Sequence, residues 1–292
     1  MRASDVILLM RPRQWTKNLA VFAAIIFSGK LFQPGPLGRT ALAFVALDLV
    51  AAGLYAANDA VDAELDRLHP VKRERPVAVG RISKAQAYGI AVVLMVSGLA
   101  LAALLGIPFL VAVGGYIVLQ AAYAVRLKHV AIVDMLVIAA GFVIRAVSGG
   151  LVIGVPVSTW LVLCAGMLAL FLASAKRRHE LVLLGEGSGS HRPVLAEYSA
   201  ELLDSFMVTL SAATVTSYAL YTFFEPRSID HLMMLTIPFV LYGVLRYQSL
   251  VLSGGGGRPE EVLLTDRPIV IDIVLWVVTV ILVLYALPHF LH

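Results

Sequence analysis

The sequence has few charged residues and a single cysteine. Charged side chains make up 14% of the 292 residues, whereas hydrophobic ones make up 60%; a soluble globular domain carries roughly 25% charged residues. This shortage excludes a soluble domain, and a mean hydropathy of +0.88 indicates an integral membrane protein. Because Cys164 has no second cysteine to pair with, an intrachain disulfide is also excluded.

Long apolar runs recur along the whole chain. A helix needs about 20 residues to cross a hydrocarbon core of ~30 Å, and lipid offers no partner to an unpaired backbone group. The sequence therefore predicts an all-α integral membrane protein with nine transmembrane helices. The predicted spans are 18–35, 38–57, 85–105, 108–125, 131–153, 157–175, 203–224, 230–250 and 269–289.

Lys and Arg lie mainly on one side of these spans. The N-terminus and every second connection carry nineteen of the twenty-three, which predicts a cytoplasmic N-terminus and an external C-terminus. No cleavage site typical of a signal peptide is found near the first span. We expect one domain over residues 1–292 in the cell membrane, with an active site on its long, charged cytoplasmic loops. These loops are 58–84, 176–202 and 246–268.

Three aspartates follow the second predicted span. Asp59, Asp62 and Asp66 are spaced by three and four, so a helix that continues out of the membrane places them on one face. Like charges there repel one another unless a divalent cation lies between them, and Mg²⁺ prefers carboxylate and phosphate oxygens. The alternative is a solvated loop in which the acids pair with basic neighbours: Arg67, Lys72, Arg73 and Arg75.

These residues form a longer pattern. Asn58-Asp59-x-x-Asp62-x-x-x-Asp66, followed by Arg67-x-His69-Pro70-x-Lys72-x-x-Arg75-Pro76, resembles the first aspartate-rich motif of the UbiA superfamily of intramembrane prenyltransferases. The resemblance extends to "RPRQWTKN", "YAVRLKHVAIVD", "IRAVSGG" and "DRPI". It implies nine helices around a central cavity open to the cytoplasm, Mg²⁺ on the three aspartates, and substrate contacts from motif residues. Those contacts are Asn58, Arg67, Lys72 and Arg75.

The sequence departs from the usual members after the sixth span. Where they carry a second Asp-x-x-x-Asp motif, this chain reads "ASAKRRHELVLLGE", with Lys176 and Arg177 in place of acids and Glu180 nearby. An acidic wall and a basic wall suit a metal-bound diphosphate and a second phosphate held directly by cations. This pattern resembles the phosphoribosyltransferase branch of the superfamily. It implies transfer of 5-phosphoribose from phosphoribosyl diphosphate (PRPP) to decaprenyl or another polyprenyl phosphate, with release of diphosphate, for cell-wall arabinan.

The resemblance also assigns roles within that reaction. It places the PRPP diphosphate on Mg²⁺ at the aspartates and the 5-phosphate near Lys176, a predicted catalytic residue, and Arg177. Other basic residues have two interpretations: Arg11, Arg13 and Lys17 around Trp15 either grip a phosphate or orient the chain, with Lys17 favoured as functional. Lys128, on the turn after the fourth span, has the same two interpretations, and the resemblance favours a substrate contact.

Ionisable residues within apolar spans need partners or a function. Asp134 enters the fifth span, and Arg145 lies eleven residues later on the same stripe, about 16 Å deeper. Asp48 stands at a similar depth in the second span, which predicts a buried Asp48–Arg145 pair, while Asp134 and Arg145 are also candidates for substrate binding. Asp266 and Arg267, beside the glycine-rich run 253–257, are candidates without an assigned role.

Two other functions are alternatives for a membrane protein of this composition. An aromatic prenyltransferase that uses a prenyl diphosphate donor requires acids after the sixth span, and they are absent. A transporter is expected to place its charges at mid-membrane and to contain inverted repeats, which are not evident. No nucleic-acid partner is predicted. Polyprenyl length and any homo-oligomer depend on cavity shape and lipid-facing surfaces that the sequence pattern does not specify.

Overall fold

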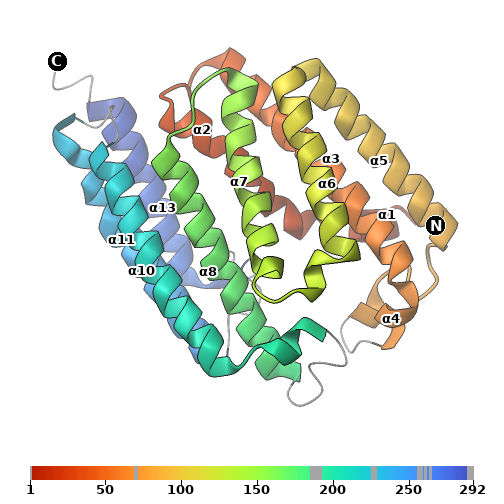
Figure 1. Cartoon of the computed structure of the whole chain (residues 1–292). Coiled ribbons are helices and arrows are strands. Elements are labelled where there is room, and N and C mark those ends of the chain that lie inside the picture. The colour runs from red at the N-terminus through yellow and green to blue at the C-terminus, as the bar shows by residue number, and fades with distance from the viewer. Residues whose placement is uncertain are drawn as a thin grey trace.

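The computed structural model describes residues 2–68, 72–184, 193–224, 229–254, 259, 262 and 265–287. Every regular element in these residues is helical, which confirms the all-α prediction, and the helices form a bundle (Figure 1). Some predicted features lie outside the described residues. These are His69 and Pro70 of the first motif, Gly255 to Gly257, part of each long loop and the end of the last span.

Eight helices in the described part of the chain are long and apolar enough to cross a membrane. Each overlaps one of the predicted spans. The first five are α3 (Pro34–Val61), α5 (Lys84–Leu105), α6 (Ile107–Val125), α7 (Val133–Ile153) and α8 (Thr159–Leu184). The remaining three are α10 (Ala200–Phe224), η6 with α11 (Ile229–Thr236 and Ile237–Leu252), and α13 with the π-helical η7 (Arg267–Ile281 and Leu282–Ala286).

The first predicted span, 18–35, has a different form. After α1 (Ala3–Met10), the chain forms the 3₁₀-helix η1 (Pro12–Val21) and the short α2 (Phe22–Phe27). The helix ends in a turn at Gly29, whose positive φ of 68° suits glycine, and Pro34 then starts α3. This segment is not among the eight span-length helices, so the count of nine stays a prediction.

Glycine and proline set the short turns between spans. Gly106 separates α5 from α6 with a φ of 126°, and a proline occupies the first turn of α6. Gly154 ends α7 in the left-handed conformation. Ser83 begins α5 with a capping box, in which its hydroxyl accepts from the Gln86 backbone N–H at 3.2 Å and its own N–H donates to the Gln86 side chain.

The packing brings the charged segments to one end of the bundle. α3 packs along α5, α10 packs along α8, and α7 lies between them in contact with α3, α6 and α8. The short α4 (Ala63–Leu68), η3 (Leu127–His129) and the C-terminal end of α8 all lie at the lower end in Figure 1. Lys176 to Glu180 lie within α8 and not in a loop, because α8 continues to Leu184.

A pocket of about 420 Å³ lies elsewhere. It is lined by residues between the α2–α3 turn and the last helix, at the opposite end of α3 from the aspartates: Gly29, Phe32, Gln33, Ile281, Tyr285 and Ala286. None of these residues is charged. The central cavity implied by the family resemblance is a different feature and stays a prediction.

Gly149 explains part of the stretch "IRAVSGG". It lies on α7 where η1 crosses, and an added Cβ would be 2.0 Å from the carbonyl oxygen of Val21. The neighbouring contact is backbone, which cannot rotate away as a side chain can. Glycine at 149 therefore lets the 3₁₀ segment pack directly against α7.

Replacing Gly149 by alanine should destabilise the protein. The methyl group forces η1 away from α7, and overpacking of this kind costs about 1–3 kcal/mol. Thermal unfolding in detergent measures the effect. The control is Gly114→Ala on α6, where no atom lies within 4 Å of the added Cβ and better helix propensity should slightly raise stability. A Gly149→Ala protein as stable as Gly114→Ala would contradict this packing role.

Candidate active site

The aspartate-rich motif lies at the junction of α3 and α4. α3 ends at Val61 and the chain bends at Asp62, but helical hydrogen bonding continues: Asp62 N–H donates to Asn58 O at 2.9 Å and Asp66 N–H donates to Asp62 O at 2.8 Å. Asp59 and Asp66 are buried, at 1% and 3% exposure. Asp62 is half-buried and Asn58 is exposed. The motif therefore turns two of its three carboxylates inward.

Two arginines neutralise these buried carboxylates. Arg11 forms an ion pair with Asp59 Oδ1. Arg75 Nη1 donates to the same Asp59 oxygen at 3.1 Å and to Asp66 Oδ2 at 2.7 Å. Buried charges are costly unless they are paired, so these contacts allow the motif to fold without a bound ligand. The alternative interpretation, in which the acids of this loop pair with basic neighbours, predicted the contacts with Arg75.

The same contacts test whether the motif suits a metal ion. No three acidic, His or Cys side chains in the described ranges are arranged to hold a metal. Yet Asp59 and Asp66 each present an oxygen to one cationic nitrogen, Arg75 Nη1, so these two carboxylates are the residues that would hold a divalent cation. Carboxylate oxygens are the donors that Mg²⁺ prefers, and the two residues fit it. The Asp62 side chain does not join them among the described residues, and its metal role stays a prediction.

Two other basic residues of the motif have different surroundings. Arg67 Nε donates to the Ala78 carbonyl at 2.8 Å, and its Nη1 pairs with Glu64 at 2.7 Å. These contacts tie α4 to the segment that follows it. Lys72 lies exposed on η2 (Lys72–Glu74). The structure thus gives Arg67 a structural role, and substrate binding by Arg67 and Lys72 stays a prediction.

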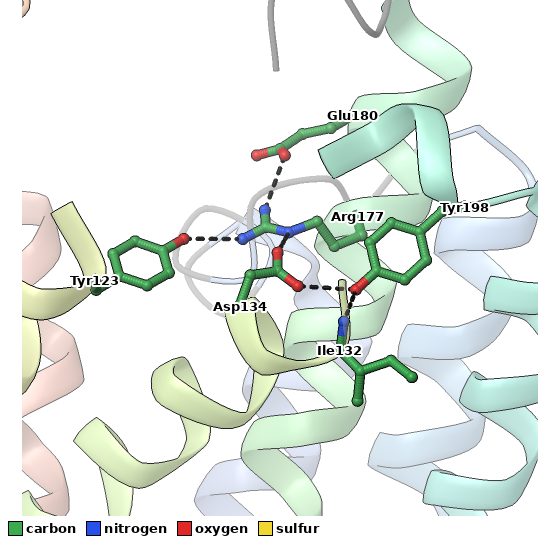
Figure 2. Close-up of polar contacts among 6 residues, drawn as sticks. All are labelled: Tyr123, Ile132, Asp134, Arg177, Glu180 and Tyr198. Atoms are coloured by element: carbon green, nitrogen blue, oxygen red, sulfur yellow. Dashed lines mark hydrogen bonds and ion pairs between the residues drawn. The ribbon is translucent and has the colours of Figure 1, made fainter. Parts of the chain in front are cut away.

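The predicted basic wall lies on α8, where Arg177 is buried at 1% exposure, and Figure 2 shows its polar partners. Its Nε donates to Asp134 Oδ2 at 2.5 Å, Nη1 to Glu180 Oε2 at 2.8 Å and Nη2 to Tyr123 Oη at 3.2 Å. All three nitrogens of the guanidinium therefore have protein partners. Lys176, by contrast, is half-buried one residue earlier. The geometry makes Arg177 a link between α8 and the α6–α7 turn.

Tyr198 completes this cluster. Its hydroxyl donates to Asp134 Oδ1 at 2.8 Å and accepts from the Ile132 backbone N–H at 2.5 Å (Figure 2). Burial raises the pKa of Tyr198 to about 12, so the hydroxyl stays protonated and remains a donor at neutral pH. Ile132 has a φ of 66°, rare for a β-branched residue, and this hydrogen bond helps to hold it. Asp134 is thus a structural acceptor for two side chains.

A second buried cluster corrects the predicted Asp48–Arg145 pair. Asn18 lies between the two residues: its Nδ2 donates to Asp48 Oδ1 and its Oδ1 accepts from Arg145 Nε, both at 2.5 Å. Arg145 also donates to Tyr116 Oη at 2.6 Å and to the Gly141 carbonyl at 2.9 Å. An amide can donate to the acid and accept from the base at once, which satisfies both charged groups. The cluster fixes η1 against α3 and α7.

Asp266 and Arg267 lie at the start of α13. Asp266 is its N-cap, because Oδ1 accepts from the Ile269 backbone N–H at 3.1 Å. Its other oxygen accepts from Arg246 Nη2 at 2.9 Å, and this hydrogen bond lowers the pKa of Asp266. Arg267 is exposed in the first helical position. Asp266 therefore has a structural explanation that the sequence did not suggest.

The two remaining basic candidates are Lys17 and Lys128. Lys17 is half-buried on η1, next to Asn18, and Lys128 is half-buried on η3. Lys128 has no hydrogen-bond or ion-pair partner within the described part of the chain. Substrate binding by Lys17 and Lys128 stays a prediction.

Sequence reasoning missed several residues of these clusters. Asn18 belongs to the quoted stretch "RPRQWTKN", and an amide at the edge of an apolar span was a usable signal for a buried partner. Tyr123 also belongs to a quoted stretch, "YAVRLKHVAIVD", but neither it nor Tyr116 and Tyr198 indicated a buried polar partner. A tyrosine in an apolar helix packs as an ordinary hydrophobic residue unless a distant segment supplies a partner for its hydroxyl.

The comparisons with known proteins agree with this fold. The UbiA prenyltransferase family model matches residues 19–179. The decaprenyl-phosphate phosphoribosyltransferase of Corynebacterium glutamicum is 35% identical over 99% of this chain and 89% of its own length. The enzyme of the same name from Mycolicibacterium smegmatis is 37% identical, over 95% of this chain and 91% of its own.

Among solved structures, a UbiA homolog from Archaeoglobus fulgidus bound to GPP and Mg²⁺ superposes with a TM-score of 0.73. It is 22% identical, and the match covers 96% of this chain and 99% of that one. This likeness concerns the fold. Together with the family match and the full-length relatives, it leads to one conclusion: the chain belongs to the UbiA prenyltransferase family.

Proposed function

We propose that this protein transfers 5-phosphoribose from PRPP to a polyprenyl phosphate and releases diphosphate, as a Mg²⁺-dependent phosphoribosyltransferase. The observation that carries the proposal is its 35% and 37% identity, over nearly the full chain, to two proteins named decaprenyl-phosphate phosphoribosyltransferase. The chemistry of the charged end supports it. Two buried acids lie at the junction of α3 and α4, and Lys176 lies on α8 at the same end of the bundle. Acids that can hold a metal-bound diphosphate and a lysine that can pair with a second phosphate suit a donor with two phosphate groups.

In this proposal Asp59 and Asp66 hold Mg²⁺, with Asp62 joining them, and Asn58 contacts the diphosphate. Bound there, Mg²⁺ would neutralise the diphosphate and stabilise the charge that develops on it. Lys176 faces the 5-phosphate, and Lys17 and Lys128 hold phosphate groups at the mouth of the site. Arg177 and Asp134 act indirectly, because their contacts fix the end of α8 against the α6–α7 turn.

The reaction itself needs little proton transfer. The lipid phosphate is already an anion, and one of its oxygens forms the new bond to the anomeric carbon of ribose. The bond from that carbon to the diphosphate breaks, and the electron pair leaves with the diphosphate, which inverts the anomeric centre. The protein's task is to align the two anions and to compensate their charge, so positioning and electrostatic stabilisation dominate.

The proposal also includes a topology. The distribution of Lys and Arg supports a cytoplasmic N-terminus and an external C-terminus. The active site would then face the cytoplasm. η1 and α2 would form the ninth membrane segment, as part of one domain over residues 1–292 around a central cavity. The product would supply five-carbon units for cell-wall arabinan. A homo-oligomer in the bilayer is compatible with the broad apolar surface.

The direct test is to incubate the purified protein with PRPP, Mg²⁺ and decaprenyl phosphate and to detect a phosphoribosylated lipid by mass spectrometry. The proposal expects this product and expects no turnover when EDTA is added. A parallel incubation contains a prenyl diphosphate and an aromatic acceptor. Prenylation of the acceptor, without phosphoribosyl transfer in the first reaction, would overturn the proposal.

Lys176→Met should reduce discrimination for the 5-phosphate. A charge-assisted contact contributes roughly 1.5–3 kcal/mol, so PRPP affinity should fall about tenfold to a hundredfold. Ribosyl diphosphate, which lacks the 5-phosphate, should lose little. Competition binding with both compounds measures the ratio, and Lys84→Met, which removes an exposed lysine paired with Glu64, is the control. Unchanged discrimination in Lys176→Met would place the 5-phosphate elsewhere, with Lys17 and Lys128 the next candidates.

A further inference from the structure

Arg11 has an unusual backbone conformation. It joins α1 to η1 with φ 53° and ψ 64°, in the left-handed region. A non-glycine residue pays a conformational cost there, and surrounding contacts must hold it in place. The backbone N–H of Arg11 donates to Leu8 O at 3.3 Å, and its carbonyl accepts from the Gln14 N–H at 2.8 Å. The chain thus makes a sharp, held turn at this arginine.

The turn directs the Arg11 side chain at the acidic motif. Its guanidinium pairs with Asp59 Oδ1 and lies over the ring of Tyr55, 4.9 Å from the centroid. Tyr55 is one helical turn before Asp59 on α3, so the two contacts hold the guanidinium from adjacent positions. The side chain is 25% exposed and therefore within reach of a ligand. The sequence did not distinguish Arg11 from Arg13, and it favoured Lys17 as the functional residue of the three.

Arg11 and Arg75 together balance the two buried acids. Asp59 accepts from both arginines, and Asp66 accepts from Arg75. A divalent cation cannot bridge these oxygens while Arg75 Nη1 lies between them. If a cation displaces the arginines, two guanidinium groups are left beside a metal-bound anion, and a guanidinium prefers to bind phosphate oxygens in pairs.

We propose that Arg11 and Arg75 occupy the cation position of the motif when no ligand is bound, and transfer to the diphosphate when a metal ion takes Asp59 and Asp66. Arg11 is then a diphosphate-binding residue. This inference rests on the metal role in the proposed function. It predicts that removing Arg11 changes the affinity for the metal ion and the affinity for diphosphate in opposite directions. Removing Arg11 removes a competitor of the metal and also a ligand of the diphosphate. A purely structural role would weaken both.

The experiment uses Arg11→Met in the full-length protein in detergent. Mn²⁺, which is visible by electron paramagnetic resonance, is titrated without substrate, and inorganic diphosphate is then titrated at saturating Mg²⁺ by calorimetry. We expect Mn²⁺ to bind roughly tenfold more tightly and diphosphate roughly tenfold more weakly than in the wild type. Arg81→Met is the matched control, because Arg81 pairs with Asp5 of α1 at 3.3 Å, away from the aspartate motif. Both affinities should be unchanged in it.

Weaker Mn²⁺ binding in Arg11→Met, or unchanged diphosphate binding, would overturn the inference. If Arg11→Met does not purify as a folded protein, Arg75→Met tests the same exchange, and the same two signs are expected. Inorganic diphosphate is the group shared by PRPP and prenyl diphosphates. The result therefore does not depend on which donor the enzyme uses, and a failure of phosphoribosyl transfer remains distinguishable from a failure of this inference.

Discussion

Asp59→Asn should lose at least about a hundredfold in turnover, since metal-assisted stabilisation of a leaving diphosphate is worth several kcal/mol. The substitution keeps the shape of the side chain and removes the charge that Arg11 and Arg75 now balance. The response to Mg²⁺ should shift to higher concentration. Steady-state transfer measured over a range of Mg²⁺ concentrations, alongside thermal unfolding, checks both expectations.

Asp204→Asn is the matched control. Asp204 also pairs with an arginine, Arg178, but on α10, so its Mg²⁺ response should equal that of the wild type. Asp62→Asn separates two possibilities for the motif. If Asp62 joins the metal on binding, its variant should resemble Asp59→Asn. Full turnover with an unchanged Mg²⁺ response in Asp62→Asn would show that Asp62 does not bind the metal. The same result in Asp59→Asn would contradict the proposed metal site as a whole.

Arg177→Met should be the most destabilising substitution at the charged end of the bundle. Arg177 is 1% exposed and its guanidinium contacts Asp134, Glu180 and Tyr123. Its removal leaves the fully buried Asp134 without its cation, and breaking a buried ion pair costs about 3–5 kcal/mol. Thermal unfolding of the purified protein in detergent, with and without PRPP, measures the loss of stability.

Two further variants make the result interpretable. Arg177→Met combined with Asp134→Asn should recover part of the stability, because removal of both partners leaves no buried charge. Arg178→Met, one residue away, breaks a pair that is partly exposed and should cost less. If Arg177→Met is as stable as the wild type but binds PRPP at least tenfold more weakly, Arg177 is a phosphate ligand and the structural role proposed for it is wrong.

The sequence predicted the membrane class, the position of eight helices and the family. These follow from local properties. An apolar run of about 20 residues forms a helix in lipid, because no other local structure satisfies its backbone groups. Gly106 and Gly154 form turns whatever the surrounding fold, because both adopt a positive φ. The spacing predicted that Asp59, Asp62 and Asp66 share one helix face. The chain bends at Asp62, however, and only Asp59 and Asp66 are buried.

The partners of the charged side chains were decided by the tertiary structure. Asn18 joins Asp48 to Arg145 across three segments, and Arg177 points inward to Asp134 while its neighbour Lys176 stays half-buried. Helices that are apolar on every face show no periodicity that distinguishes lipid-facing residues from residues that face the protein interior. A buried charged side chain pairs with whichever complementary group the packing brings near. Its partner is therefore determined only when distant helices meet.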